Sequence, residues 1–169
     1  MSKVLLIGVR LIKAESIIES NVDDAVLSKV ISNVQDIQLK PILGIDLFNT
    51  VCNEVIAKAA NNSYIIAEPT KTLLDEYIQP YLVNATVAEF IAINNYKISN
   101  KGIQKLNDNS SSAINSNEVE YLKNYYDNYV STYKSNLIKY LKDNKLNVKD
   151  ADTNITLPSI GWFFPQEYK

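Results

Sequence analysis

Hydrophobic residues recur at intervals of three and four over most of the chain, which predicts a mainly helical protein. The first such run follows Asp23, a residue that can cap a helix N-terminus. Its stripe consists of Val26, Leu27, Val30, Ile31, Val34 and Ile37. Pro41 and Gly44 then interrupt the pattern, so a second helix is expected to begin at Ile45 or Asp46 and to end before the sequence NNSY.

The two longest stripes predict a pair of long helices, over residues 70–99 and 117–144. The first contains Pro80, which removes one backbone hydrogen bond and is expected to bend the helix. Because a connection of moderate length joins the two helices, they are expected to be antiparallel neighbours, each about 40 Å long. The apolar positions are Leu74, Tyr77, Ile78, Tyr81, Val87, Phe90 and Ile91 in the first helix, and Val119, Leu122, Tyr126, Tyr129, Tyr133, Leu137 and Tyr140 in the second.

The two ends of the chain have a different character. Residues 3–13, KVLLIGVRLIK, lack a helical stripe and fit a short strand or an extended arm. Residues 145–169 contain two prolines and no helical stripe, which predicts an extended tail. We therefore expect an all-α fold in the main, a small bundle of about four helices over residues 1–144. Residues 1–20 would form an N-terminal arm and residues 95–116 a projecting loop.

Composition is that of a folded chain with no strong electrostatic preference. The 169 residues are 46% hydrophobic and 21% charged, and a net charge of −2 gives no reason to expect tight binding to nucleic acid. The apolar run Val4 to Val9 is too short to cross a membrane or to serve as a signal peptide core, so the chain is interpreted as cytosolic in origin. Cys52 is the single cysteine, and its apolar neighbours predict a buried thiol.

The sequence offers little catalytic or metal-binding chemistry. No histidine is present, which removes the commonest general base and metal ligand, and the four glycines are too scattered for a phosphate-binding loop. Asp23 and Asp24 are better explained by helix capping than by paired acid and base work. The sequence DADTN resembles the start of a calcium loop, but Ile155 and Gly161 occupy the positions of its glycine and glutamate. We expect no enzyme activity, no cofactor and no metal.

Tyrosines are concentrated in the last predicted helix. Tyr121 and Tyr125 lie off its apolar stripe, and exposed tyrosine is typical of protein interfaces. A partner surface and simple exposure both remain open for these two residues. Base stacking, as in single-strand binders, is disfavoured because no basic groove accompanies the tyrosines.

Two stretches together resemble a known family. In residues 21–51 a helix with acidic residues and a glutamine leads through a leucine-glycine step into a second helix. The residues concerned are Asp23, Asp24, Gln35, Leu43, Gly44 and Leu47. In the second stretch, ISNKGIQ ends a long helix and a polar loop leads into the tyrosine-rich helix. Both resemble the head-tail connector (adaptor) proteins of tailed bacteriophages, especially the ring proteins of crAss-like phages.

The resemblance implies a structural virion protein, synthesised in the host cytoplasm and placed at the head-tail junction. About twelve copies would form a ring that joins the portal at the capsid vertex to the tail and leaves a channel for DNA. The implied partners are other copies of the chain, the portal protein and downstream tail or second connector proteins, with no membrane and no sequence-specific DNA contact. A different class, a small helical partner-binding or regulatory phage module without a virion role, is the alternative.

Candidate interface residues follow from the resemblance and from the pattern. The loop between the long helices would contact neighbouring subunits or the channel, and the aromatic tail has a large apolar area that should be buried in the functional state. These candidates are Asn100, Lys101, Gly102, Ile103, Tyr121, Tyr125, Trp162, Phe163 and Phe164. The tail is expected to dock on a neighbouring subunit or another virion protein; folding back onto its own helices is the alternative.

Overall fold

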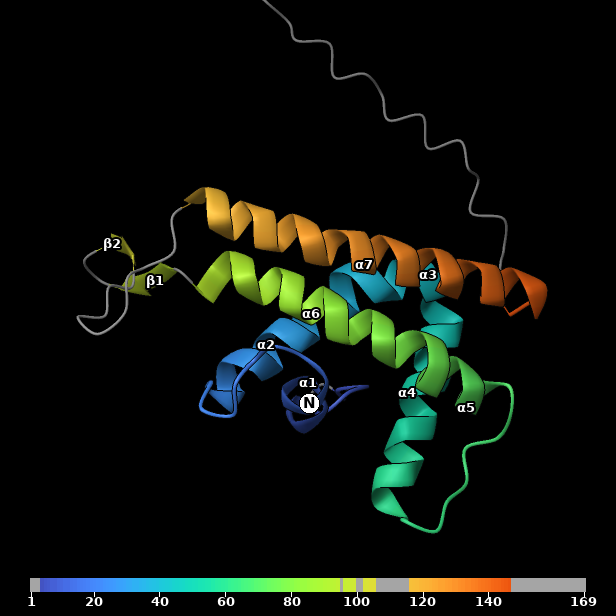
Figure 1. Cartoon of the computed structure of the whole chain (residues 1–169). Coiled ribbons are helices and arrows are strands. Elements are labelled where there is room, and N and C mark those ends of the chain that lie inside the picture. The colour runs from blue at the N-terminus through green and yellow to red at the C-terminus, as the bar shows by residue number, and fades with distance from the viewer. Residues whose placement is uncertain (1–3, 95, 100–101, 106–115, 147–169) are drawn as a thin grey trace, which may run out of the picture.

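The computed structural model describes residues 4–94, 96–99, 102–105 and 116–146, and this part of the chain is mainly helical (Figure 1). The elements are α1 (Val9–Glu15), α2 (Asp24–Val34), η1 (Gln35–Leu39), α3 (Lys40–Leu43), α4 (Ile45–Ala60), α5 (Thr70–Thr72), η2 (Leu73–Ile78), α6 (Gln79–Asn94), β1 (Tyr96–Ser99), β2 (Gly102–Lys105) and α7 (Ser116–Asp143). The segments η1 and η2 are π-helical. The predicted helical fold is confirmed, with an antiparallel two-stranded hairpin added to it.

Helix α6 lies at the centre of the bundle and α7 runs antiparallel beside it (Figure 1). Helix α2 packs on α6 as well, so α6 is covered from more than one side. More residues of α6 are therefore buried than the single predicted stripe contains, because a helix enclosed by neighbours is buried on all sides. The buried residues of α6 are Tyr81, Leu82, Val83, Ala85, Thr86, Val87, Ala88 and Phe90.

Helix α2 begins where the sequence predicts. The Asp23 carboxylate accepts a hydrogen bond from the Ala25 amide at 2.7 Å, as an N-cap residue does. The predicted stripe is wrong at its two ends, because Val26 is 39% and Ile37 is 72% exposed. Ile37 lies in π-helical η1, whose wider turn shifts the positions that face the core away from a 3.6-residue period.

The predicted helix over residues 70–99 is interrupted near Pro80 and ends early. Residues Leu73–Ile78 are π-helical directly before α6, which is a common way to absorb an irregularity in a helix. Helix α6 then stops at Asn94, because the following residues form β1. Strand β1 pairs with β2 in a register that places Ile98 opposite Ile103 and Ser99 opposite Gly102.

The N-terminal segment differs from its prediction as a strand or extended arm. Residues 9–15 form helix α1, and Leu6, Ile7 and Ile12 are buried in the core. A seven-residue helix spans only two turns, too few for a recognisable stripe. Burial against the other helices, and not local periodicity, therefore determines this part of the fold.

Helix α7 ends in a Schellman motif. Lys145 has φ 52°, in the left-handed region, and the Leu146 amide donates to the Leu141 carbonyl at 3.0 Å. Leu146 is partly buried against the core, as the residue at this position of the motif commonly is. The motif fixes the direction in which the chain leaves α7. The predicted tail over residues 145–169 otherwise lies outside the described residues.

Candidate interaction surface

Three tyrosines near the start of α7 are exposed to solvent. Tyr121 is 76%, Tyr125 47% and Tyr129 41% exposed. The interpretation of Tyr121 and Tyr125 as off-stripe residues is confirmed, whereas Tyr129, predicted on the core stripe, is exposed. Steps of four residues rotate around the helix by 40° each, so this row passes gradually from solvent toward the core.

Two of the exposed tyrosines, Tyr125 and Tyr129, contact each other. The rings of Tyr125 and Tyr129 meet edge to face with centroids 5.0 Å apart, and their hydroxyls share a hydrogen bond of 2.9 Å. Tyr126, which is buried, packs edge to face on Tyr125. The hydrogen bond with Tyr129 raises the pKa of Tyr125, so its hydroxyl stays protonated well above neutral pH. The cluster is a preformed, uncharged aromatic surface.

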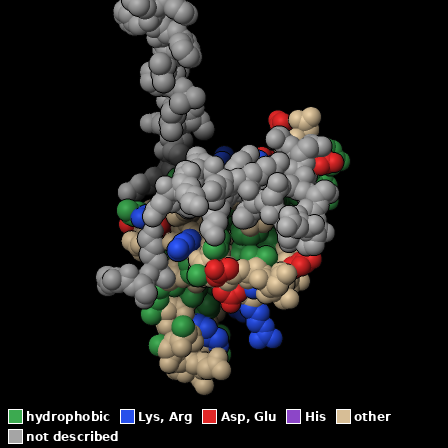
Figure 2. All heavy atoms as spheres, turned by 90° about the vertical axis from the view of Figure 1, so that its left-hand side faces the viewer, with side chains coloured by type: hydrophobic (Ala, Val, Ile, Leu, Met, Phe, Trp, Pro, Cys, Tyr) green, Lys and Arg blue, Asp and Glu red, His purple; other side chains and the backbone are tan. Residues whose placement is uncertain are grey.

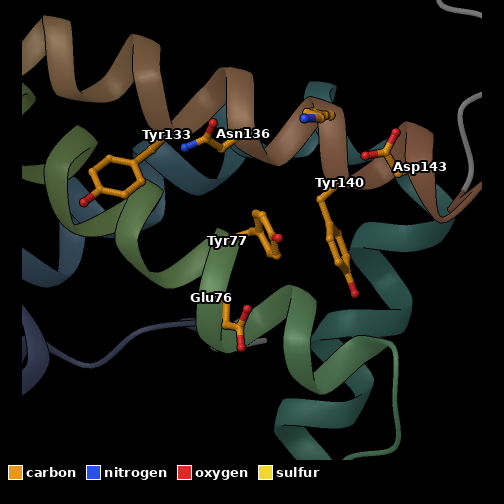
Figure 3. Close-up of a pocket in the computed structure, with 7 residues that line it drawn as sticks. Glu76, Tyr77, Tyr133, Asn136, Tyr140 and Asp143 are labelled. Atoms are coloured by element: carbon orange, nitrogen blue, oxygen red, sulfur yellow. The ribbon is translucent and has the colours of Figure 1, made fainter.

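A pocket lies farther along α7, where this helix meets η2 (Figure 3). Its volume is about 360 Å³, and its lining residues are Glu76, Tyr77, Tyr133, Asn136, Lys139, Tyr140 and Asp143. The rings of Tyr77 and Tyr140 stack with centroids 4.1 Å apart. Burial, and then the nearby Glu68 carboxylate, raise the pKa of Tyr140, so its hydroxyl stays protonated near neutral pH.

The hairpin places part of the predicted loop at one end of the bundle. Strands β1 and β2 lie beyond the end of α6 and the start of α7 (Figure 1). Gly102 and Ile103 are the first two residues of β2. Viewed from this end, the molecule presents hydrophobic side chains next to acidic and basic ones (Figure 2). Tyr121 lies in the second turn of α7, so it belongs to the same end of the long helices as the hairpin.

The remaining predicted interface residues lie outside the described part of the chain. These are Asn100, Lys101, Trp162, Phe163 and Phe164. Their roles stay predictions.

The residues of the first family-like stretch have structural roles. Asp23 caps α2, and the Asp24 carboxylate pairs with the Lys13 ammonium group at 2.6 Å. Gln35 is 3% exposed and binds backbone groups of the N-terminal segment.

The leucine-glycine step separates α3 from α4. Gly44 has φ 73°, a conformation that residues with a side chain rarely adopt. Leu43 before it is buried and Leu47 after it packs partly against the core. This step lets the short helix α3 and the longer helix α4 pack on the same core.

Cys52 was predicted as a buried thiol and is half-buried, packed partly against the core. Burial is the main cause that raises its pKa, followed by the Asp36 carboxylate. A raised pKa keeps the thiol protonated and lowers its nucleophilicity near neutral pH.

Within the described ranges, no three His, Cys, Asp or Glu side chains converge in a way that could hold a metal ion. In the same part of the chain, no helix combines the length and the apolar character needed to cross a bilayer.

Sequence reasoning missed the stacked pair Tyr77 and Tyr140. Both were assigned to apolar stripes, correctly, but on different helices. No signal in the sequence links the two residues, because periodicity within each helix says nothing about which residue of the other helix it faces. The partner across the pocket could not be identified without knowing how α7 packs on η2.

The described chain is thus a mainly helical domain with a hairpin and an aromatic surface at one end. It belongs to a family of unknown function (DUF6712), whose model matches residues 39–154. The matched region begins at the end of η1 and includes all of α7. No curated protein and no solved structure matched the chain.

Proposed function

We propose that this protein is a structural subunit of a tailed-bacteriophage virion. About twelve copies would form a ring between portal and tail, with an open channel for DNA. The observation that supports this best is the placement of two candidate contact elements, the hairpin and Tyr121, at one end of the long helix pair. The resemblance described above supplies the assembly in which such an end would contact a neighbour.

A two-stranded hairpin is well suited to an intermolecular contact. Two strands are marginally stable in water by themselves, and additional pairing or packing stabilises them. The register between Tyr96–Ser99 and Gly102–Lys105 defines an antiparallel ladder, and among the described residues each strand pairs only with the other, so a partner strand could add to an outer edge. Contact with an adjacent subunit would add backbone hydrogen bonds to the hairpin.

A ring also requires a second, different surface on each subunit, because head-to-tail contacts join unlike patches. Ile37 in η1 and Ile45 at the start of α4 are 72% and 60% exposed. Burying such side chains contributes about 25 cal/mol per Å² of apolar area, before the cost of ordering. We assign them to the surface that receives the hairpin end of the next copy.

The proposed assembly has partners beyond other copies. The portal protein would lie on one side of the ring and tail or second connector proteins on the other. DNA would pass through the channel without sequence-specific binding, in keeping with a net charge of −2. The protein would be made in the host cytoplasm and function in the virion.

Quantitative mass spectrometry of purified phage particles tests the proposal. The protein should be present at the copy number of a ring, in a fixed ratio to the portal protein. Electron microscopy of the purified chain mixed with portal should show rings at the portal base. Absence of the protein from intact virions would reject the proposal.

The second candidate, a small helical partner-binding or regulatory phage module, rests on the pocket between η2 and α7. With a volume of about 360 Å³ and aromatic walls, it could accept a side chain of a host protein. The same mass spectrometry separates the two functions, because a regulator would be found in infected cells and not in particles.

A further inference from the structure

Four tyrosines of α7 lie along one side of the helix, and three of them, Tyr129, Tyr133 and Tyr140, belong to its predicted apolar stripe. Tyr125, Tyr129, Tyr133 and Tyr140, here called the tyrosine flank, are separated by four, four and seven residues. At 100° per residue these spacings keep all four on one side of the helix, within an arc of about 80°. The flank runs from the exposed ring of Tyr125 to Tyr140, which stacks on Tyr77 in the pocket. Figure 3 shows the pocket end, with Tyr77, Tyr133 and Tyr140.

This surface is unusual for a solvent-facing side of a helix. Tyr125 and Tyr129 are 47% and 41% exposed, yet their rings are held in edge-to-face contact and their hydroxyls are bonded to each other. The pocket at the other end is lined by Tyr133 and Tyr140 of the flank and by one further aromatic ring, that of Tyr77. Preformed aromatic rings of this kind bind other apolar and aromatic side chains at low cost in side-chain entropy.

The chain itself contains a complementary segment. Residues 147–169 follow the last described residue and include Trp162, Phe163 and Phe164. Helix α7 ends at Asp143, which lines the pocket, and the left-handed residue of the Schellman motif, Lys145, follows two residues later. The segment therefore starts next to one end of the tyrosine flank.

The length of the segment is sufficient to reach the far end of the flank. From Tyr125 to Asp143 the helix rises about 27 Å, at 1.5 Å per residue. The chain from Leu146 to Trp162 can span up to about 50 Å when extended. A segment tethered this closely has an effective concentration of the order of millimolar at the flank, which favours it over a free partner.

We propose that the C-terminal segment folds back and binds the tyrosine flank of its own chain, with Trp162, Phe163 and Phe164 packed on Tyr125 and Tyr129. This contact would cover the apolar rings of both partners and leave Tyr121 and the hairpin free. It decides between the two placements of the tail that the sequence left open, in favour of the chain's own helices. It does not depend on the proposed virion function.

Trp162 is the only tryptophan, so its fluorescence reports directly on the contact. In the full chain, diluted until it is monomeric, we expect emission at short wavelength and weak quenching by acrylamide. The double variant Y125S/Y129S should shift the emission to longer wavelength and increase quenching. Loss of aromatic contacts at two rings should lower the ratio of docked to free segment about tenfold.

The matched control is Ile65→Ser, which removes another exposed apolar side chain, 81% exposed, between α4 and α5. This variant should leave Trp162 emission unchanged, and far-ultraviolet circular dichroism should show that all variants keep their helices. Three results would overturn the proposal. The first is strong acrylamide quenching of Trp162 in the unmodified monomer. The second is weak quenching that becomes strong on dilution, because Trp162 would then be covered by a second copy of the chain. The third is weak quenching that stays the same in Y125S/Y129S.

Discussion

The Leu6 amide donates a hydrogen bond of 2.7 Å to the side-chain oxygen of Gln35, across 29 residues of sequence. The side-chain nitrogen of the same glutamine donates to the Val4 carbonyl at 3.0 Å. One buried side chain thus satisfies two backbone groups of a segment that is not helical. This arrangement holds the N-terminal segment on the core beside α2 and η1.

Replacing Gln35 with Ala should therefore destabilise the protein more than the loss of a few side-chain atoms alone would. The change leaves the Leu6 amide and the Val4 carbonyl without their partner, which costs about 2–4 kcal/mol in the free energy of unfolding. Urea denaturation measures the loss. Hydrogen exchange at Leu6 should accelerate more than exchange at core positions of α6.

The control for this change is Gln79→Ala, because the amide of Gln79 makes only an exposed contact of 3.4 Å with Asp75 among the described bonds. It should alter stability by less than about 0.5 kcal/mol. Equal effects of the two variants would show that Gln35 does not hold the segment.

The sequence predicted the parts of the fold that local chemistry determines. Asp23 as a cap, Gly44 as a break and the long α7 were all visible, because capping and a 3.6-residue period depend on near neighbours. Helix α1 and the π-helical segments were not visible. Their conformations depend on contacts such as that between Gln35 and Leu6, which are distant in sequence.

Thr86 offers a second test, on the central helix. It is 0% exposed, and its hydroxyl is a buried side-chain oxygen without a hydrogen-bond partner among the described residues. Thr86→Val replaces this hydroxyl with a methyl group of similar shape and should raise the free energy of unfolding by about 1 kcal/mol. Thr132→Val is the control, since its exposed hydroxyl bonds the Asn128 carbonyl. A loss of stability in Thr86→Val would reveal a partner for the hydroxyl.

Lys145 tests the end of α7. Its φ of 52° places a residue with a side chain in the left-handed region, where glycine has no steric penalty. Lys145→Gly should stabilise the protein by about 1 kcal/mol, and Lys145→Val should destabilise it because a β-branched residue fits this conformation poorly. Thermal unfolding of the two variants measures the difference. An opposite order would mean that α7 does not end in this motif in solution.

Tyr81 makes stability depend on pH in the alkaline range. Burial raises its pKa from 10.0 to about 12. Between these values the unfolded chain releases the proton while the folded chain retains it, so the folded state binds more protons and stability falls as pH rises. The loss should reach up to about 3 kcal/mol near pH 12 and be absent below pH 9.

The variant Tyr81→Phe isolates this effect from the other tyrosines. It lacks the titrating hydroxyl, and with it a 3.3 Å bond to Gln38. Urea denaturation at several pH values should show a smaller alkaline decline for Tyr81→Phe than for the unmodified chain. Parallel curves would mean that Tyr81 ionises as easily in the folded state as in the unfolded one.

Only part of the candidate surface could be predicted. The off-stripe positions of Tyr121 and Tyr125 followed from spacing within one helix. The pocket of Tyr77 and Tyr140 joins residues 63 positions apart, and it exists because η2 packs on α7. The hairpin was expected only as a loop, because strand pairing depends on register between segments more than on any periodic pattern.

Tyr121 provides the most direct test of the hairpin end as a contact surface. At 76% exposure it contributes little to the fold, so Tyr121→Ser should change the free energy of unfolding by less than about 0.5 kcal/mol. Truncating a tyrosine at the centre of an interface often lowers the binding free energy by about 2 kcal/mol, which would weaken subunit association about thirtyfold. Analytical ultracentrifugation and electron microscopy with portal should therefore show fewer rings at equal concentration. Ile65→Ser, equally exposed but outside the proposed contact, should assemble normally, and unchanged assembly of Tyr121→Ser would remove this residue from the interface.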